Sequence, residues 1–367
     1  MLPTPAPDLS TFFLGSRTID NIIITREFLT DEEYNCKLYF TNLRSNSIPS
    51  TRGSFLIVHG FGEYSSRYLP FAIELAKKHF DVFLFDFRGF GYSSGVRAST
   101  TLKEFFQDLV IVLNNVNKNA PLYVLGHSMG GGVVLSFLKL NPKVKITGVM
   151  LSNPFMEFPR SLKMNFAKRL AGSFLSRHAP EFFMNPGVDP HFLTKNPHNI
   201  PKIINDRLMI PFACTIMLKT FMDIRDIIFK KIYKNHKISV PLLFLISLKD
   251  ALCSPEFSLK FYNSLKKQDK RLVLFDDGRH EVIFDEEQPE VLEKIDDFVK
   301  EIEQRAQSSG GEPRLFTVPS YVNFNYSVFD WKKLFKFVVL VVVLGYLGKR
   351  RKRIARTVLS LIGFQGN

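Results

Sequence analysis

Residues 126–130 read Gly-His-Ser-Met-Gly, which is the pattern G-x-S-x-G. They follow the apolar run 121–125 and precede a helical pattern of apolar residues, so the sequence predicts a strand, a tight turn and a helix. Such a turn, called a nucleophile elbow, holds its serine in a strained conformation with the hydroxyl clear of the sheet. Gly126 and Gly130 leave the room that strand and helix need. Ser128 is therefore a candidate nucleophile, although a glycine-rich turn can also be purely structural.

Short apolar runs alternate with helical patterns along most of the chain. Continuous runs, typical of strands buried on both faces, occur at residues 54–58, 81–85, 121–125, 146–151, 241–246 and 271–275. Helical patterns occur at residues 68–78, from the capping box Thr101–Glu104 onward, and at 289–305. This alternation predicts an α/β fold with a mostly parallel sheet covered on both faces. Residues 20–42 alternate weakly and predict an antiparallel hairpin at the sheet's edge.

The net charge of +14 makes the chain strongly basic, and the kind of partner it indicates depends on where the basic residues lie. Nine Lys or Arg and no acidic residue lie between Lys332 and the end of the chain, so most of the excess belongs to a C-terminal tail. No RNA-binding signature, zinc-ligand spacing or basic stripe with interleaved aromatic residues accompanies it. The sequence therefore argues against a nucleic-acid partner.

The cysteines and the N-terminal residues indicate the cellular compartment of the protein. Cys36, Cys214 and Cys253 are odd in number and widely spaced, which is typical of a reducing compartment rather than of a disulfide framework. Residues 1–7 lack the basic and apolar regions of a secretory signal, and no metal-ligand cluster appears. We expect an intracellular protein without a bound metal.

Residues 153–239 interrupt the alternation of strands and helices. The stretch is rich in Phe and Met among basic residues and has no clear strand. It follows the strand at 146–151, so it is expected over the carboxyl edge of the sheet, where open α/β sheets bind ligands. Either these apolar residues form the core of a helical insertion, or the insertion is a lid that binds an acyl chain.

A serine hydroxyl becomes a strong nucleophile only when a base takes its proton, so Ser128 requires a histidine and the histidine an acid. On a nucleophile elbow these partners follow in the order serine, acid, histidine. Asp250 and His280 fit this order, and each follows a later strand. The structural alternatives are a helix cap near residue 254 for Asp250 and an ordinary loop position for His280. His127 is expected to be a structural or pocket residue.

The negative oxygen that forms during acyl transfer needs two backbone donors placed in advance. We assign the amides of Met129, just after the nucleophile, and of Phe61, in the loop after the strand at 54–58. His59-Gly60 permits the close approach of this loop. Such a site needs neither a metal nor a cofactor.

Several stretches in combination resemble the monoacylglycerol lipase and lysophospholipase group of the α/β-hydrolases, the serine aminopeptidase-like family. They are residues 59–68, 86–95, 126–130, Asp250 and His280-Glu281. The resemblance covers about residues 20–305. It implies an α/β-hydrolase fold, the triad and oxyanion hole assigned above, and an insertion that forms a lid over a long acyl tunnel.

The chain departs from the family's pattern at two places. Ser247-Leu248-Lys249 precedes the acid, where the family typically has a glycine. Phe87 and Phe90 stand where the family prefers histidine. These differences bear on rate or substrate more than on the class of reaction.

The sequence predicts four regions along the chain. They are an N-terminal extension at 1–19, the α/β-hydrolase domain at 20–305, a linker at 306–331 and a hydrophobic, basic, membrane-associating tail at 332–367. Leu334–Gly348 is apolar except for Lys336, and Lys349–Arg353 is wholly basic. A helix over that apolar run spans ~22 Å, less than the ~30 Å of a hydrocarbon core. A short membrane anchor, an in-plane helix and a buried element all stay open.

These features together predict a membrane-associated serine esterase with a cytosol-facing catalytic domain. It is expected to hydrolyse monoacylglycerol or a related lysolipid to a free fatty acid through an acyl-enzyme. A lysophospholipase and an acyltransferase are related alternatives, because His280 to Asp285 also reads H-x-x-x-x-D, an acyltransferase-like pattern. A noncatalytic membrane-anchored scaffold and peptide cleavage are the alternatives from other classes.

Overall fold

The computed structural model describes residues 14–47, 51–159, 166–185, 188–233, 238–266, 268–310, 315–318 and 322. The chain divides into two units, Met1–Phe324 and Asn325–Asn367. The predicted tail at 332–367 lies outside the described residues. No helix in the described part of the chain is long and apolar enough to cross a membrane.

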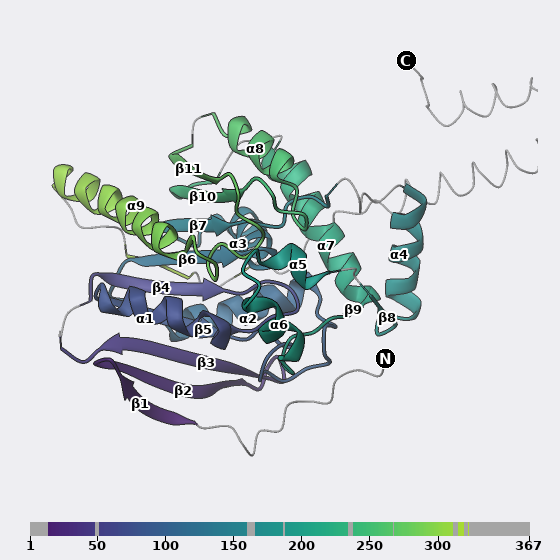
Figure 1. The fold of residues 1–367 in the computed structure, drawn as a ribbon, viewed down its shortest axis with the longest axis horizontal. Helices are drawn as coiled ribbons and strands as arrows, with labels where there is room; N and C mark the ends of the chain where they lie inside the picture. The colour runs from purple at the N-terminus through teal and green to yellow at the C-terminus, as the bar shows by residue number, and fades with distance from the viewer. Residues whose placement is uncertain are drawn as a thin grey trace, which may run out of the picture. The chain divides into compact units, whose positions relative to one another are not determined.

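A nine-stranded sheet forms the centre of the described structure, in the order β1-β2-β3-β5-β4-β6-β7-β10-β11 (Figure 1). Its strands are β1 (Gly15–Ile19), β2 (Ile22–Asp31), β3 (Cys36–Ser45), β4 (Gly53–Val58), β5 (Phe80–Phe85), β6 (Leu122–His127), β7 (Gly148–Ser152), β10 (Leu242–Ser247) and β11 (Lys270–Phe275). From β5 to β11 neighbouring strands are parallel, and β1, β2 and β3 are added antiparallel at one edge. The predicted mostly parallel sheet with an antiparallel hairpin at its edge is confirmed. Strand pairing begins at Gly15, before the predicted domain start at residue 20.

Helices cover both faces of this sheet. They are α1 (Leu69–Lys77), α2 (Leu102–Asn115), α3 (Met129–Leu140), α8 (Pro255–Ser264) and α9 (Gln288–Ser308), and the 3₁₀ helix η2 (Ser65–Tyr68) precedes α1. Residues of α1 and α9 share one buried cluster with alternate strand residues such as Leu243 and Leu245 of β10. Phe244, between them, contacts the ring of Phe261 in α8. This period of two is what a strand buried on both faces requires.

Between β7 and β10 the chain forms a mainly helical insertion, which Figure 1 shows at the end of the sheet toward which the parallel strands point. Its elements are α4 (Phe166–His178), β8 (Phe183–Met184), α5 (Pro190–Leu193), α6 (Asn199–Asn205), β9 (Ala213–Cys214), α7 (Thr215–Ile227) and the π-helix η4 (Ile228–Tyr233). The short antiparallel pair β8–β9 was not predicted, because two residues per strand leave no pattern in the sequence.

Part of the predicted linker at 306–331 packs as ordered structure. Helix α9 continues to Ser308, and Thr317 forms an antiparallel bridge with Lys145. Phe316 and Val322 are buried. The polar composition of residues 306–313 indicated a linker but carries no information about these apolar side chains further on.

Candidate active site

Ser128 lies at a strained turn between β6 and α3. Its φ of 51° and ψ of −121° fall outside the regions that residues with a side chain normally adopt. A Cβ on Gly126 would lie 2.7 Å from the Cα of Gly131, and one on Gly130 would lie 2.3 Å from the carbonyl oxygen of Val58. Both positions therefore require glycine, and the predicted strand, turn and helix are confirmed.

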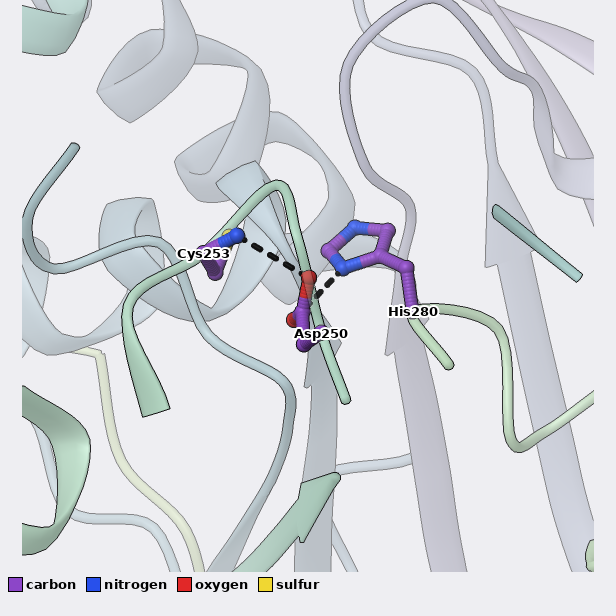
Figure 2. Close-up of side chains that lie close together, drawn as sticks. All are labelled: Asp250, Cys253 and His280. Carbon is purple, nitrogen blue, oxygen red and sulfur yellow. Dashed lines mark hydrogen bonds and ion pairs between the residues drawn. The ribbon is translucent and has the colours of Figure 1, made fainter. Parts of the chain in front are cut away.

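His280 and Asp250 form a buried pair beside this turn. The Nδ1 atom of His280 lies 2.8 Å from Oδ2 of Asp250. The other oxygen, Oδ1, accepts hydrogen bonds from the amides of Leu252 at 2.8 Å and Cys253 at 3.0 Å, so the carboxylate is fixed by its own loop (Figure 2). Asp250 does not cap helix α8, because the side chain of Ser254 accepts the hydrogen bond from the N-terminus of that helix.

The electrostatic surroundings of His280 favour its protonated form. Burial lowers its pKa, but the charge of Asp250, the hydrogen bond to it and the charge of Glu281 outweigh burial and raise the pKa above the ordinary value of 6.5. The histidine is thus prepared to accept a proton and to carry the resulting charge. Its Nδ1 faces the acid, which leaves Nε2 as the nitrogen available to a substrate or nucleophile.

His127 stays neutral and faces elsewhere. Burial and the charge of His280 lower the pKa of His127 to about 3. Its Nδ1 lies 3.1 Å from the carbonyl oxygen of Ser152 and 3.2 Å from its Oγ. The ring of His127 packs 4.8 Å from that of His280 and lines the same cavity. Its surroundings fit the predicted structural or pocket role.

Ser128 and His280 open into one cavity of about 450 Å³ beneath the insertion. Most of its wall is apolar and comes from the insertion: Phe155, Phe158, Met184, Val188, Pro190, Leu193, Ile203, Ile204, Met209, Ile210, Pro211, Ala213, Leu218 and Phe221. The rings of Phe61 and Phe221 lie edge to face, 5.5 Å apart, and join the insertion to the loop after β4. The cavity is suited to an apolar ligand with one polar end at Ser128.

The two predicted oxyanion donors lie beside Ser128. Met129 is the first residue of α3, so its amide has no partner within the helix. The loop of Phe61 passes close to the serine, since a Cβ on Gly60 would lie 3.0 Å from the Cβ of Ser128. The structure thus brings Phe61 and Met129 to the same place as the serine, while their role as donors stays a prediction.

A buried ionic network behind the site was not predicted. Arg67 donates to Glu63 at 2.7 Å and makes two hydrogen bonds of 2.8 Å to Glu281, the residue after His280. Glu63 also accepts from the amide of Gly60 at 2.6 Å and from Tyr68 Oη at 2.7 Å. Burial lowers the pKa of Arg67, but the charges of Glu281 and Glu63 outweigh it and raise the pKa. Arg67 therefore connects the loop after β4, which carries Gly60 and Phe61, to the loop that carries His280.

Asn153 is a second unpredicted contact. Its side chain exchanges hydrogen bonds of 2.8 Å with Ser247 and donates to the carbonyl oxygen of His280 at 2.8 Å. Ser247 belongs to the tripeptide that departs from the family's pattern before the acid. The contact gives this serine a structural role at the end of β10, where it helps to hold the histidine loop.

The two phenylalanines at positions where the family prefers histidine pack against the loop after β4. The rings of Phe87 and Phe90 pack against His59 at 5.1 and 5.7 Å. His59 Nε2 accepts a hydrogen bond from the amide of Phe87 at 3.0 Å, and burial lowers the pKa of this histidine. With Phe87 and Phe90 in place of histidines, the side chains that pack against His59 in the loop after β4 are therefore apolar.

Asp250, Cys253 and His280 also lie close enough to suggest a metal site, with ligand atoms within 4.8 Å of one another (Figure 2). Both carboxylate oxygens of Asp250 are occupied by hydrogen bonds. Burial and the charge of Asp250 raise the pKa of the Cys253 thiol well above its ordinary value, so it is a poor metal ligand. The group fits a hydrogen-bonded acid and base better than a metal centre.

Comparisons with known proteins agree with this arrangement. The family model described as serine aminopeptidase, S33, matches residues 49–287, which include Ser128, Asp250 and His280. Monoglyceride lipase of Saccharomyces cerevisiae is 27% identical over 255 residues, covering 65% of this chain and 80% of the yeast protein. An uncharacterized abhydrolase domain-containing protein of Dictyostelium discoideum is 25% identical over 268 residues, which are 71% of this chain but 28% of that relative.

A solved structure shows the same architecture. The crystal structure of Paleococcus ferrophilus monoacylglycerol lipase is 26% identical and superposes with a TM-score of 0.64, covering 72% of this chain and 99% of that one. The strand order, the elbow and the family match lead to the same assignment. The chain belongs to the serine aminopeptidase S33 family of α/β-hydrolases.

Proposed function

We propose that this protein is a serine esterase that hydrolyses monoacylglycerol, or a related lysolipid, to a free fatty acid and an alcohol. One observation carries the proposal: Ser128 and His280 face a common apolar cavity, and His280 Nδ1 lies 2.8 Å from buried Asp250. The similarity to lipases of monoacylglycerol supports the choice of substrate class.

The proposed reaction has two halves. Ser128 Oγ attacks the ester carbonyl while His280 Nε2 takes the hydroxyl proton, and Asp250 stabilises the imidazolium. The amides of Phe61 and Met129 bind the negative oxygen of the tetrahedral intermediate. His280 then gives its proton to the departing alcohol, which leaves an acyl-serine. Water, deprotonated by His280, releases the fatty acid in the second half and restores Ser128.

The apolar lining of the cavity supports binding of a long acyl chain. Each methylene removed from water contributes about 0.8 kcal/mol, so the apolar insertion wall favours long acyl groups. The polar end lies at Ser128, His127 and Glu63. This distribution supports a binding mode in which the ester lies at the elbow and the acyl chain lies beneath the insertion.

Labelling with a fluorophosphonate tests the proposed nucleophile. We expect one adduct on Ser128 in the folded protein and none in Ser128→Ala. A folded wild-type protein that takes up no label would contradict the mechanism and favour a noncatalytic scaffold. Competition by an added alcohol acceptor separates hydrolysis from acyl transfer, because a transferase forms the new ester in preference to free acid.

We also propose that residues 332–367 attach the protein to a membrane, with the catalytic domain facing the cytosol. The apolar run Leu334–Gly348 and the basic cluster Lys349–Arg353 support this, since a cationic cluster beside apolar residues favours anionic headgroups. Cosedimentation with anionic vesicles tests it. Replacing the five basic residues with glutamine should weaken binding, and unchanged binding would count against the electrostatic part.

A further inference from the structure

The insertion is fastened to the loop that carries His280 through one buried carboxylate. Asp285 accepts hydrogen bonds from the backbone amide of Lys195 at 3.1 Å, from Asn199 Nδ2 at 3.2 Å and from Thr194 Oγ1. The Thr194 residue is fully buried, and Asp285 is 5% exposed. A buried carboxylate with several donors holds its partners in one geometry, because each unpaired group would be costly.

Further hydrogen bonds join the same two segments next to His280 itself. The amide of Glu281 donates to the carbonyl oxygen of Leu193 at 2.8 Å. On the other side of the histidine, Arg279 Nη1 donates to the carbonyl oxygen of Thr194 at 3.1 Å. Leu193 lines the cavity. The same set of hydrogen bonds therefore holds both the cavity wall at Leu193 and the loop that carries His280.

The contacts of Asp285 explain the H-x-x-x-x-D pattern of residues 280–285 without acyl transfer. His280 takes its carboxylate partner from Asp250, not from Asp285. The amide of Asp285 donates to the carbonyl oxygen of Glu281 at 3.1 Å, so the chain turns back after the histidine and directs this carboxylate toward the insertion.

We propose that Asp285 is a positioning residue, which acts through Thr194 and Lys195 to hold the cavity wall at Leu193 and the His280 loop as one unit. The inference rests on the proposed esterase function. Loosening the contact displaces the base relative to Ser128, which slows acylation of every ester. It also displaces Leu193, which weakens binding of long acyl chains only.

The test compares Asp285→Asn, Thr194→Val and the double variant on a short and a long p-nitrophenyl ester. Both single variants should lower kcat about tenfold on both esters, since small misplacements of catalytic groups cost this much or more. KM should rise for the long ester alone. The double variant should be no worse than Asp285→Asn alone, because Thr194 acts through its hydrogen bond to Asp285.

Two variants serve as controls. Thr194→Ser keeps the hydroxyl and should restore wild-type kinetics. Glu293→Gln removes a charge from a side chain of α9 that is 64% exposed and pairs with the neighbouring Lys294, so it should change nothing.

Three results would overturn the proposal. The first is a lower melting temperature with unchanged kcat and KM, which would make Asp285 a purely structural residue. The second is additive losses in the double variant. The third is a folded wild-type protein that hydrolyses neither ester, which would overturn the proposed function as well and is thereby distinguishable from the other two.

Discussion

Two neighbouring histidines show how surroundings assign roles at the scale of single residues. His280 and His127 are both buried and their rings lie 4.8 Å apart, yet their pKa values move in opposite directions. His280 has the Asp250 carboxylate on Nδ1, whereas Nδ1 of His127 lies beside the carbonyl and hydroxyl oxygens of Ser152. A carboxylate stabilises the imidazolium, so only His280 is suited to act as a base.

The pH dependence of labelling follows from this difference. A base must be neutral to take a proton, and the pKa of His280 is raised above 6.5. The rate of fluorophosphonate labelling should therefore fall as pH is lowered through a midpoint above 6.5. Asp250→Asn should move that midpoint down, because the charge that raises the pKa is removed.

Stopped-time labelling between pH 5 and about pH 9 measures the wild-type midpoint and its shift in Asp250→Asn. This pH range brackets both an ordinary and a raised histidine pKa. His178→Gln, a histidine of the insertion for which no catalytic role is assigned, is the matched control and should leave the midpoint in place. A wild-type midpoint below 6.5 would show that burial outweighs Asp250.

At the scale of elements, the elbow depends on how closely β6, β4 and α3 approach one another. The start of α3 touches the end of β4, since a Cβ on Gly130 would lie 2.3 Å from Val58 O and 2.6 Å from His59 O. These atoms belong to the backbone and cannot move aside as a flexible side chain would. The close contact sets where Ser128 and the loop after β4 meet.

Gly130→Ala should therefore abolish labelling of Ser128 and lower the melting temperature. Gly172→Ala in α4 is the matched control, because the nearest atoms to its new methyl group are the ends of flexible side chains, Leu218 Cδ2 at 3.1 Å and Met222 Cε at 3.6 Å. Alanine is favoured over glycine within a helix by roughly 0.5–1 kcal/mol, so this variant should be as stable as wild type or more so. Equal melting temperatures for both variants would contradict the account of the elbow.

Most elements could be predicted because their signals are local. The apolar runs, the capping box at Thr101 and the G-x-S-x-G turn each lie within a few residues, and the structure contains them all. Asp250 and His280 could be proposed because chain order and strand ends restrict the choice. The Arg67–Glu281 pair could not, because it joins residues 214 positions apart with no pattern to link them.

At the scale of the whole molecule, Arg67 connects parts of the fold that are distant in sequence. Its partner Glu63 lies in the loop after β4, its partner Glu281 follows His280, and both carboxylate side chains are nearly inaccessible. Removing the cation leaves two buried carboxylates without a counter-charge. Such a loss typically costs about 3–5 kcal/mol, far more than the loss of a surface ion pair.

Arg67→Met should thus lower the free energy of unfolding by about 3–5 kcal/mol in urea titrations. Arg271→Met is the control, because the Arg271–Glu301 pair is 41% exposed on both sides and should contribute about 1 kcal/mol or less. Similar losses of unfolding free energy in the two variants would show that the buried network stabilises the fold no more than a surface ion pair does.

The C-terminal boundary of the catalytic unit also belongs to this scale. Phe316 and Val322 are buried, so a chain ending at residue 310 lacks them and one ending at 324 keeps them. Burying one large apolar side chain contributes about 1.5–3 kcal/mol, so the shorter chain should unfold at lower urea concentration. Coincident unfolding curves would show that the residues after 310 add nothing to the stability of the catalytic unit, as expected of a linker.

Fatty-acid release from a long-chain monoacylglycerol by the protein of residues 1–367, measured beside Ser128→Ala, tests the central claim most directly. The account predicts steady release by the wild-type protein and loss of at least about 10³-fold in the variant, the scale expected when a catalytic nucleophile is removed. Lysophosphatidylcholine, measured in parallel, ranks the two headgroups. Release that persists in folded Ser128→Ala, or a folded wild-type protein that releases nothing from either lipid, would contradict the account.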